Sequence, residues 1–214
     1  MAMNTFDKFL EKYPLVAFEK GQIILLKDEI PKGVYIIASG LVKTYTINQS
    51  GEERLISIDS KGEDIPIGFT AGLITKSQYF YEAYRHCTLR VIPCEAYLEH
   101  LSGNNESLLR RHVRITKLLL SSLSRIEALE QSTASDKVAY TLLYIADKIG
   151  GRFLSHKTRL NLTITQQEIA NALGLSRETA GIVLKKLELK KLLVHSRNSY
   201  VLYTEKLLAY LNRR

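Results

Sequence analysis

The 214-residue sequence has no tryptophan, few cysteines and no long apolar segment. Cys87 and Cys94 are its only cysteines, too few for a disulfide framework or for an iron–sulfur cluster held by four thiolates. No stretch reaches the ~18 apolar residues of a membrane-spanning helix, and residues 1–18 lack the apolar run of a secretion signal. We therefore expect a cytoplasmic protein without membrane segments, bound cluster or other cofactor.

Basic residues exceed acidic ones only in the C-terminal part of the sequence. Residues 1–135 contain 16 basic and 16 acidic side chains, whereas residues 136–214 contain 14 basic and 6 acidic ones, so the whole net charge of +8 lies there. A balanced body joined to a basic module favours a polyanionic partner such as nucleic acid. A basic surface that serves only solubility is the alternative.

Residues 16–93 consist of short apolar runs separated by turn residues, a pattern typical of an all-β sandwich or barrel. The predicted strands include residues 22–26, 33–38, 41–47, 54–58 and 87–92. The segment from Asn48 to Gly51 predicts a hairpin loop, because glycine readily adopts a positive φ. We expect an antiparallel barrel of the jelly-roll type, or double-stranded β-helix.

The periodicity changes after residue 105, where a segment without proline or glycine begins. Apolar side chains at helical spacing predict one long helix over about residues 105–132, with stripes formed by Leu108, Ile115, Leu119, Ile126 and Leu129 and by Leu109, Val113, Leu120 and Leu123. Two stripes would let the helix pack on its own domain with one and on a partner with the other, as at a coiled-coil seam. We expect a homodimer helix. Complete burial in one larger core is the alternative.

The Ser-Thr-Ala-Ser segment at residues 132–135 interrupts this periodicity and predicts a hinge. Ser135 or Asp136 is expected to cap a following helix over about residues 137–149, closed by two glycines. Alternating apolar residues at 160, 162 and 164 predict a short strand. The expected organisation is α+β: a barrel in residues 1–104, a dimerisation helix and hinge in residues 105–135, and a third domain in residues 136–214.

The third domain carries the sequence pattern of a helix-turn-helix. Thr165 and Glu168 form a capping box that begins a short helix, and Gly174 ends it. Ser176 then caps a second helix over about residues 177–189. Apolar segments at 192–195 and 200–203 predict a β-hairpin, which would form a wing. A helix, a glycine-containing turn and a second helix predict a domain whose second helix enters the major groove.

Two residues at the start of the second helix are suited to reading bases. Arg177 can donate to guanine O6 and N7, and Glu178 can accept from cytosine N4. Phosphate contacts are expected from Thr165, Ser176, Thr179, Lys185 and Arg197. A winged helix that binds protein is the competing interpretation, but it would leave the localised positive charge without a partner.

These residues resemble the Crp/Fnr family of bacterial transcription regulators over nearly the whole chain. The most specific match is the segment from Leu162 to Thr179, and residues 136–144, 35–40 and 48–52 are similar to other parts of that family. The resemblance implies a homodimer on a two-fold symmetric operator in double-stranded DNA, with a sensing barrel and RNA polymerase as a further partner. It also implies that Arg177, Glu178 and Gln167 read or assist at bases. Ile182 stands where many relatives carry another base-reading arginine, and could pack on a thymine methyl group.

The barrel departs from relatives that bind cyclic nucleotides. Those relatives hold the phosphate with a Gly-Glu segment and an Arg-Ser pair, whereas this sequence has Ile67 near the carboxylate position and Lys76-Ser77 as a poor substitute. Cyclic AMP is therefore not expected, although a cyclic-nucleotide-responsive regulator remains the alternative if Glu82 and Arg85 could serve instead. Haem would need an axial ligand, for which His86 is the only candidate at the barrel.

The expected pocket is rich in aromatic residues. Its candidate lining is Ile67, Phe69, Tyr79, Phe80, Tyr81, Tyr84 and Arg85. On a strand, Tyr79, Tyr81 and Arg85 would face one side, and Phe80, Tyr84 and His86 the other. Either these side chains fill the pocket, so that no ligand is needed, or they bind a small apolar or aromatic effector whose anionic group Arg85 anchors. The first alternative is slightly favoured.

A jelly-roll metalloenzyme is the rival of a different class. The five histidines lack paired metal-ligand spacing, and the sequence contains neither a nucleophile elbow nor a phosphate-binding loop. We therefore expect no metal site and no enzymatic activity.

Overall fold

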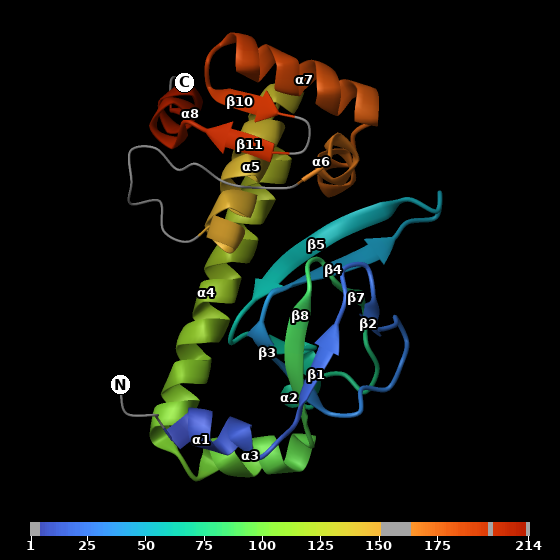
Figure 1. Cartoon of the computed structure of the whole chain (residues 1–214), viewed down its shortest axis with the longest axis vertical. Coiled ribbons are helices and arrows are strands. Elements are labelled where there is room, and N and C mark those ends of the chain that lie inside the picture. The colour runs from blue at the N-terminus through green and yellow to red at the C-terminus, as the bar shows by residue number, and fades with distance from the viewer. Residues whose placement is uncertain (1–4, 151–163, 197–198, 213–214) are drawn as a thin grey trace. The chain divides into compact units, whose positions relative to one another are not determined.

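A computed structural model describes residues 5–150, 164–196 and 199–212 (Figure 1). The chain divides into two compact units. One comprises Met1–Thr46 and Ile56–Leu119, and the other comprises Ile47–Leu55 and Leu120–Arg214. The first unit contains most of the β-structure, and the second contains the C-terminal helices and a small hairpin.

Two four-stranded sheets form the β-structure. The first sheet has the order β1 (Leu15–Phe18), β8 (Cys87–Ile92), β3 (Val34–Ser39) and β6 (Asp64–Ile65). The second has the order β2 (Ile23–Leu25), β7 (Phe80–Ala83), β4 (Leu41–Ile47) and β5 (Glu53–Ser60). Buried side chains from both sheets form one core cluster, including Leu25, Ile37, Val42, Tyr81 and Leu89. These two sheets, called the β-domain below, confirm the predicted antiparallel β-structure. β4 and β8 have the predicted bounds, and β5 is longer than expected.

The predicted hairpin loop between β4 and β5 is also confirmed. The Asn48 side chain accepts hydrogen bonds from the backbone N–H groups of Ser50 and Glu52, at 3.0 and 2.9 Å. Gly51 has φ +78°, a value that side chains other than glycine rarely adopt. This local hydrogen bonding explains why a few residues were sufficient to predict the turn.

Three helices of this unit were not predicted: α1 Thr5–Glu11, α2 Ile67–Thr70 and α3 Cys94–Ser102. Phe6 and Phe9 of α1 and Tyr97 of α3 pack with Ile36 and Ile92 in a second apolar cluster. Figure 1 shows α1 and α3 side by side. Because Tyr97 is fully buried, this cluster anchors the helices firmly to the sheet.

Helix α4 (Asn105–Glu130) confirms the predicted long helix, which Figure 1 shows as continuous. The prediction that one of its apolar stripes packs on its own domain is wrong. Its buried side chains in the described chain are Ser107, Arg125 and Ala128. Seven apolar side chains from both predicted stripes are instead exposed: Leu108, Leu109, Val113, Leu119, Leu120, Leu123 and Ile126. Ile115 and Leu129 are partly buried.

The next helix, α5 (Ala134–Gly150), begins three residues before the predicted start. Its cap is Thr133 rather than Ser135 or Asp136, since the Thr133 hydroxyl accepts from the backbone N–H of Asp136 at 3.1 Å and donates to its carboxylate at 2.7 Å. The second glycine expected to close this helix, Gly151, and two of the three residues of the predicted strand at 160–164 lie outside the described residues.

The rest of the second unit consists of α6 (Gln166–Leu173), α7 (Arg177–Leu189), β10 (Leu193–Ser196), β11 (Ser199–Leu202) and α8 (Thr204–Leu211). Both helices of the predicted helix-turn-helix have the expected bounds. The hairpin strands each lie one residue from the predicted positions, and α8 was not predicted. Within the described ranges, no helix is both long and apolar enough to cross a membrane.

Candidate DNA-binding surface

The turn between α6 and α7 is fixed by local hydrogen bonds. The backbone N–H of Glu168 donates to the Thr165 hydroxyl at 3.1 Å, and the Thr165 N–H donates to the Glu168 carboxylate at 2.6 Å, so the predicted capping box is present. Gly174 ends α6 in the left-handed conformation, with φ +66°, and its N–H donates to the carbonyl of Ala170. The Ser176 hydroxyl then accepts from the N–H of Thr179 and starts α7.

Small residues allow α6 and α7 to pack closely. Ala170 and Ala180 are both fully buried, and a Cβ atom at Gly181 would lie only 3.1 Å from Oε1 of Gln166. The buried side of α7 consists of Ala180, Val183, Leu184 and Leu187. Burial of this side leaves the opposite side of α7 exposed.

The residues expected to read bases are all on the exposed surface. Arg177 and Glu178 are exposed at the start of α7, and Ile182 is 71% exposed. Glu178, Ile182 and Lys185 share one side of the helix because residues four and three apart are neighbours. Gln167 is exposed on α6, where its amide donates to Asn171 Oδ1 at 2.7 Å.

Glu178 remains a hydrogen-bond acceptor at neutral pH. Its pKa lies below the ordinary value, chiefly because its own backbone N–H donates to the carboxylate, with a further contribution from the Ser176 hydroxyl. An ionised carboxylate offers only acceptor positions. Glu178 is therefore chemically suited to a donor such as the cytosine amino group.

The residues expected to contact phosphates differ in whether their polar groups already form hydrogen bonds within the chain. Thr165 and Ser176 are exposed, but their hydroxyls cap α6 and α7, and the partly buried Thr179 shares a 3.0 Å hydrogen bond with Ser176 Oγ. Lys185 is exposed. Arg197 lies outside the described residues. Capping leaves other N–H groups of each first turn available, and such groups favour anions.

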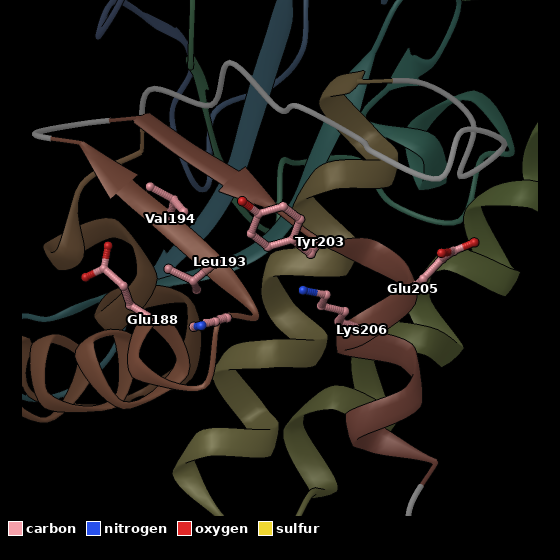
Figure 2. A pocket seen from close by; sticks show the side chains of 7 residues that line it. Glu188, Leu193, Val194, Tyr203, Glu205 and Lys206 are labelled. Carbon is pink, nitrogen blue, oxygen red and sulfur yellow. The ribbon is translucent and has the colours of Figure 1, made fainter.

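The wing is a two-stranded antiparallel hairpin, with His195 stacked on Tyr200 at 4.7 Å between ring centroids. A hollow of about 670 Å³ lies beside it and beside the end of α7, lined by Glu188, Lys191, Leu193, Val194, Tyr203, Glu205 and Lys206. Figure 2 shows Glu188 on one side of this hollow and Glu205 on the other. These two carboxylates balance the charges of Lys191 and Lys206, so the lining has no excess positive charge, and the exposed start of α7 is the better candidate surface for DNA.

The predicted effector residues do not share one environment. Tyr81 is 5% exposed within the core cluster, and Tyr79 packs against that cluster. Phe80 points away from it and stacks on Tyr45, with ring centroids 5.2 Å apart. The predicted alternation therefore holds for Tyr79, Phe80 and Tyr81. It cannot extend to residue 86, because β7 ends at Ala83.

The remaining effector candidates belong to other local structures. Ile67 and Phe69 are partly buried in α2, and Tyr84 is 6% exposed after β7. Arg85 is partly buried, and its Nη2 atom has no hydrogen-bond partner among the described residues. His86 is exposed, with Nε2 3.8 Å from Glu19 Oε1. That exposed position does not suit an axial ligand inside the barrel.

Lys76 and Ser77 stand where cyclic-nucleotide-binding relatives have an Arg-Ser pair, and the Ser77 side chain here has a structural role. Ser77 is 1% exposed and its hydroxyl donates to the carbonyl of Tyr79 at 2.6 Å, while its N–H donates to the carbonyl of Glu29. Lys76 is exposed. No group of three or more metal-ligating side chains is found in the part of the chain that the structure describes.

Sequence reasoning missed two arginines of α4 that are shielded from solvent, the partly buried Arg111 and the buried Arg125. Arg111 pairs with Asp64 on β6, and Arg125 hydrogen-bonds to residues of α5 and α6. Their spacing of 14 residues, close to four helical turns, was the available signal, because it places both on one side of the helix. That signal could not name their partners, which lie far away in the sequence.

Comparison with known proteins identifies both parts of the chain. Residues 15–104 match the model of the cyclic nucleotide-binding domain, and residues 136–210 match that of the Crp-like helix-turn-helix domain. The chain is 28% identical to electron transport regulator A of Shewanella oneidensis over 95% of its own length and 79% of that protein. It is 24% identical to the cAMP-activated global transcriptional regulator CRP of Escherichia coli over 93% and 94% of the two chains.

Solved structures show the same fold. The c-di-GMP-responsive global regulator CLP of Xanthomonas campestris matches with a TM-score of 0.75 and 24% identity, covering 93% of this chain and 98% of that one. A CRP/FNR-family regulator of Thermus thermophilus matches with a TM-score of 0.73 and 20% identity, covering 94% and 100%. The matches to both domain models and to the curated relatives assign a non-enzymatic function in transcription. The chain belongs to the Crp/Fnr family of DNA-binding transcription regulators.

Proposed function

We propose that this regulator binds a two-fold symmetric operator as a homodimer formed along α4. The observation that carries the proposal is the exposed apolar side of this helix, where seven aliphatic side chains are each 43–63% exposed. Their spacing places them on one side of the helix, which supports a continuous apolar surface. Contiguous apolar surface of this kind marks an interface, and a second copy of the same helix offers matching chemistry.

Within each half-site, we assign base reading to Arg177 and Glu178, assisted by Gln167 and by apolar contact from Ile182. Their exposure at the start of α7 supports this assignment. Lys185 and the capped first turns at Thr165 and Ser176 would hold phosphates, together with Thr179 and Arg197. The proposed functional division follows residues 1–104, 105–135 and 136–214, with RNA polymerase as a further partner of the DNA-bound dimer.

Selection of bound duplexes from a random pool tests the operator proposal. Recovered sequences should contain inverted half-sites with centres about 34 Å apart or a multiple of that distance. Recovery of a single asymmetric site, or of no common sequence, would overturn symmetric binding.

Light scattering of the purified chain tests the dimer. The wild type should have the mass of two chains, whereas Ile126→Lys should shift it towards one, because a charge would replace an apolar contact at the interface. Lys117→Ala is the control, since Lys117 is exposed on α4 outside the apolar side. Equal dissociation of both variants, or a monomeric wild type, would contradict the α4 interface.

For the barrel, we favour a core filled by its own side chains over a ligand site. The burial of Tyr81 and the packing of Tyr79 against the core cluster support this reading, and the internal hydrogen bonds of Ser77 argue against a cyclic nucleotide. The alternative is a small anionic effector anchored by Arg85. The buried Nη2 atom of Arg85, without a partner among the described residues, favours that alternative.

A thermal-shift screen with aromatic carboxylates and with cyclic AMP decides between these two possibilities. A ligand at ~100 times its dissociation constant stabilises the folded state by ~2.7 kcal/mol. A self-filled barrel gives no shift with any compound. A shift with an aromatic carboxylate that is lost in Arg85→Gln would establish the anionic effector instead.

A further inference from the structure

Arg125 is a buried cation that has no anionic partner among the residues that the structure describes. It lies near the C-terminal end of α4 and is only 5% exposed. Burial lowers the pKa of its guanidinium, but arginine remains protonated at any physiological pH. Among the described residues, no carboxylate lies within ion-pair distance of Arg125. Other interactions must therefore offset the cost of removing this charge from water.

Three contacts surround the guanidinium, and each comes from α5 or α6, in the same compact unit as Arg125. Nη1 donates to the Thr141 hydroxyl at 3.2 Å, and Nη2 donates to the backbone carbonyl of Ala172. The cation also lies over the ring of Tyr144, 5.6 Å from its centroid. Thr141 and Tyr144 belong to α5, whereas Ala172 belongs to the last turn of α6. One side chain of α4 thus contacts both neighbouring helices.

The contact with Ala172 occurs at an informative position. The last carbonyl groups of a helix lack intrahelical partners, and the negative end of the helix dipole favours a cation there. Arg125 therefore caps α6 from outside. Ala172 lies two residues before Gly174, at which the chain turns towards the recognition helix α7. A shift of this end of α6 would move the start of α7.

We propose that Arg125 is a positioning residue that sets the direction of α7 relative to α4. The inference rests on the proposed function, because in a dimer joined along α4 this direction determines the separation of the two recognition helices. The planar guanidinium can make several directional contacts at once, as an apolar side chain cannot. If Arg125 only filled space, an unbranched apolar side chain of similar length could replace it.

Arg125→Met separates these two roles. Because Arg125 has no ion-pair partner among the described residues, this substitution leaves no opposite charge buried alone, and the variant is expected to fold. Arg110→Met is the matched control, since Arg110 lies on the same helix but is partly exposed and pairs with Glu106 at 2.7 Å. Circular dichroism melting establishes that each variant is folded at the assay temperature.

The main measurement is the affinity for duplexes whose two half-sites are moved apart one base pair at a time. The wild type and Arg110→Met should prefer one spacing sharply. In Arg125→Met, the preference for this spacing over its neighbours should fall about tenfold, roughly the contribution of one hydrogen bond to a charged group. The affinity for a single half-site should not change. An unaltered spacing preference in folded Arg125→Met would overturn the proposal.

Hydrogen exchange separates failure of this inference from failure of the operator proposal. In Arg125→Met, amides of residues 173–176 should exchange about tenfold faster than in the wild type, with no change in the β-domain. If the wild type shows no spacing preference, the proposal of a symmetric operator is wrong. The rate of amide exchange in Arg125→Met then decides by itself whether Arg125 holds the end of α6. Unchanged exchange refutes the role of Arg125.

Arg125→Lys provides the second variant if Arg125→Met does not fold. Lysine keeps the charge but has one nitrogen in place of the guanidinium fork, so it should not restore the spacing preference. A wild-type spacing preference in Arg125→Lys would show that charge alone suffices and would likewise overturn the proposal.

Discussion

Arg111 of α4 donates to Asp64 of β6, with 3.1 Å between Nη2 and Oδ2. The two side chains are 13% and 3% exposed, and the Arg111 guanidinium also lies over the Tyr97 ring, 5.9 Å from its centroid. Thr70 of α2 reaches the same carboxylate oxygen at 3.5 Å. The pair thus connects the first half of α4 with the strand that precedes α2.

Asp64→Asn should destabilise the β-domain strongly. Removing one partner leaves the other charge buried without compensation, a loss of ~3–5 kcal/mol in the free energy of unfolding. Urea denaturation followed by circular dichroism measures this loss. Glu106→Gln, which removes an exposed ion pair with Arg110 on the same helix, should cost only ~0–1 kcal/mol. Equal small losses in both variants would contradict the importance of the buried pair.

Arg177→Ala should weaken binding to the selected operator by ~1–3 kcal/mol and relax the preference at one G·C pair in each half-site. The physical reason is the loss of two donors to guanine. Gel-shift titrations with operators altered at single positions provide the measurement. If the variant retains the wild-type sequence preference, Arg177 does not read a base.

Lys185→Ala should weaken binding to all duplexes nearly equally, because a phosphate contact carries no sequence information. Loss of one contact in each half-site should reduce the slope of log affinity against log salt by ~0.9 per phosphate. Titrations from low to moderate salt measure the slope. An altered base preference with an unchanged slope would place Lys185 at a base edge.

The stability of the β-domain should fall as the medium becomes acidic, in part because of His100. Burial, and to a lesser degree the charge of Lys12, lower the pKa of His100 below its ordinary value of 6.5. The unfolded chain therefore binds a proton that the folded chain resists. The resulting loss begins as the pH falls towards 6.5 and levels off below the lowered pKa.

His100→Gln tests this contribution. The ring stacks on Phe9 at 4.0 Å and its Nε2 shares a 2.9 Å hydrogen bond with Ser107, so the variant loses some stability at every pH. Denaturation curves between pH 5 and 8 should nevertheless show a shallower dependence on pH than in the wild type. Parallel dependences would mean that other groups cause the acid sensitivity.

Local signals predicted the helix-turn-helix almost to the residue. Thr165 with Glu168, Gly174 and Ser176 encode the start, end and restart of helices within a dozen residues, and the structure uses each of them as expected. The loop at Asn48 was predictable for the same reason. The hydrogen bonds concerned are made between residues four or fewer apart in the sequence.

The orientation of α4 could not be predicted in this way. Its two shielded arginines depend on distant partners: Arg125 on Ala172, 47 residues away, and Arg111 on Asp64, also 47 residues away. A hydrophobic pattern gives the period of a helix but not which side meets its own chain. The short elements α1, α2 and β6 were missed because few residues specify them locally.

Because arginines attach α4 to its neighbours while its leucines face away, mutations with different consequences fall on opposite sides of one helix. In the proposed dimer, changes among the leucines would tune self-association, and changes among the arginines would tune how adjoining helices and strands are held. During evolution, the strength of pairing and the geometry of attachment could therefore vary separately.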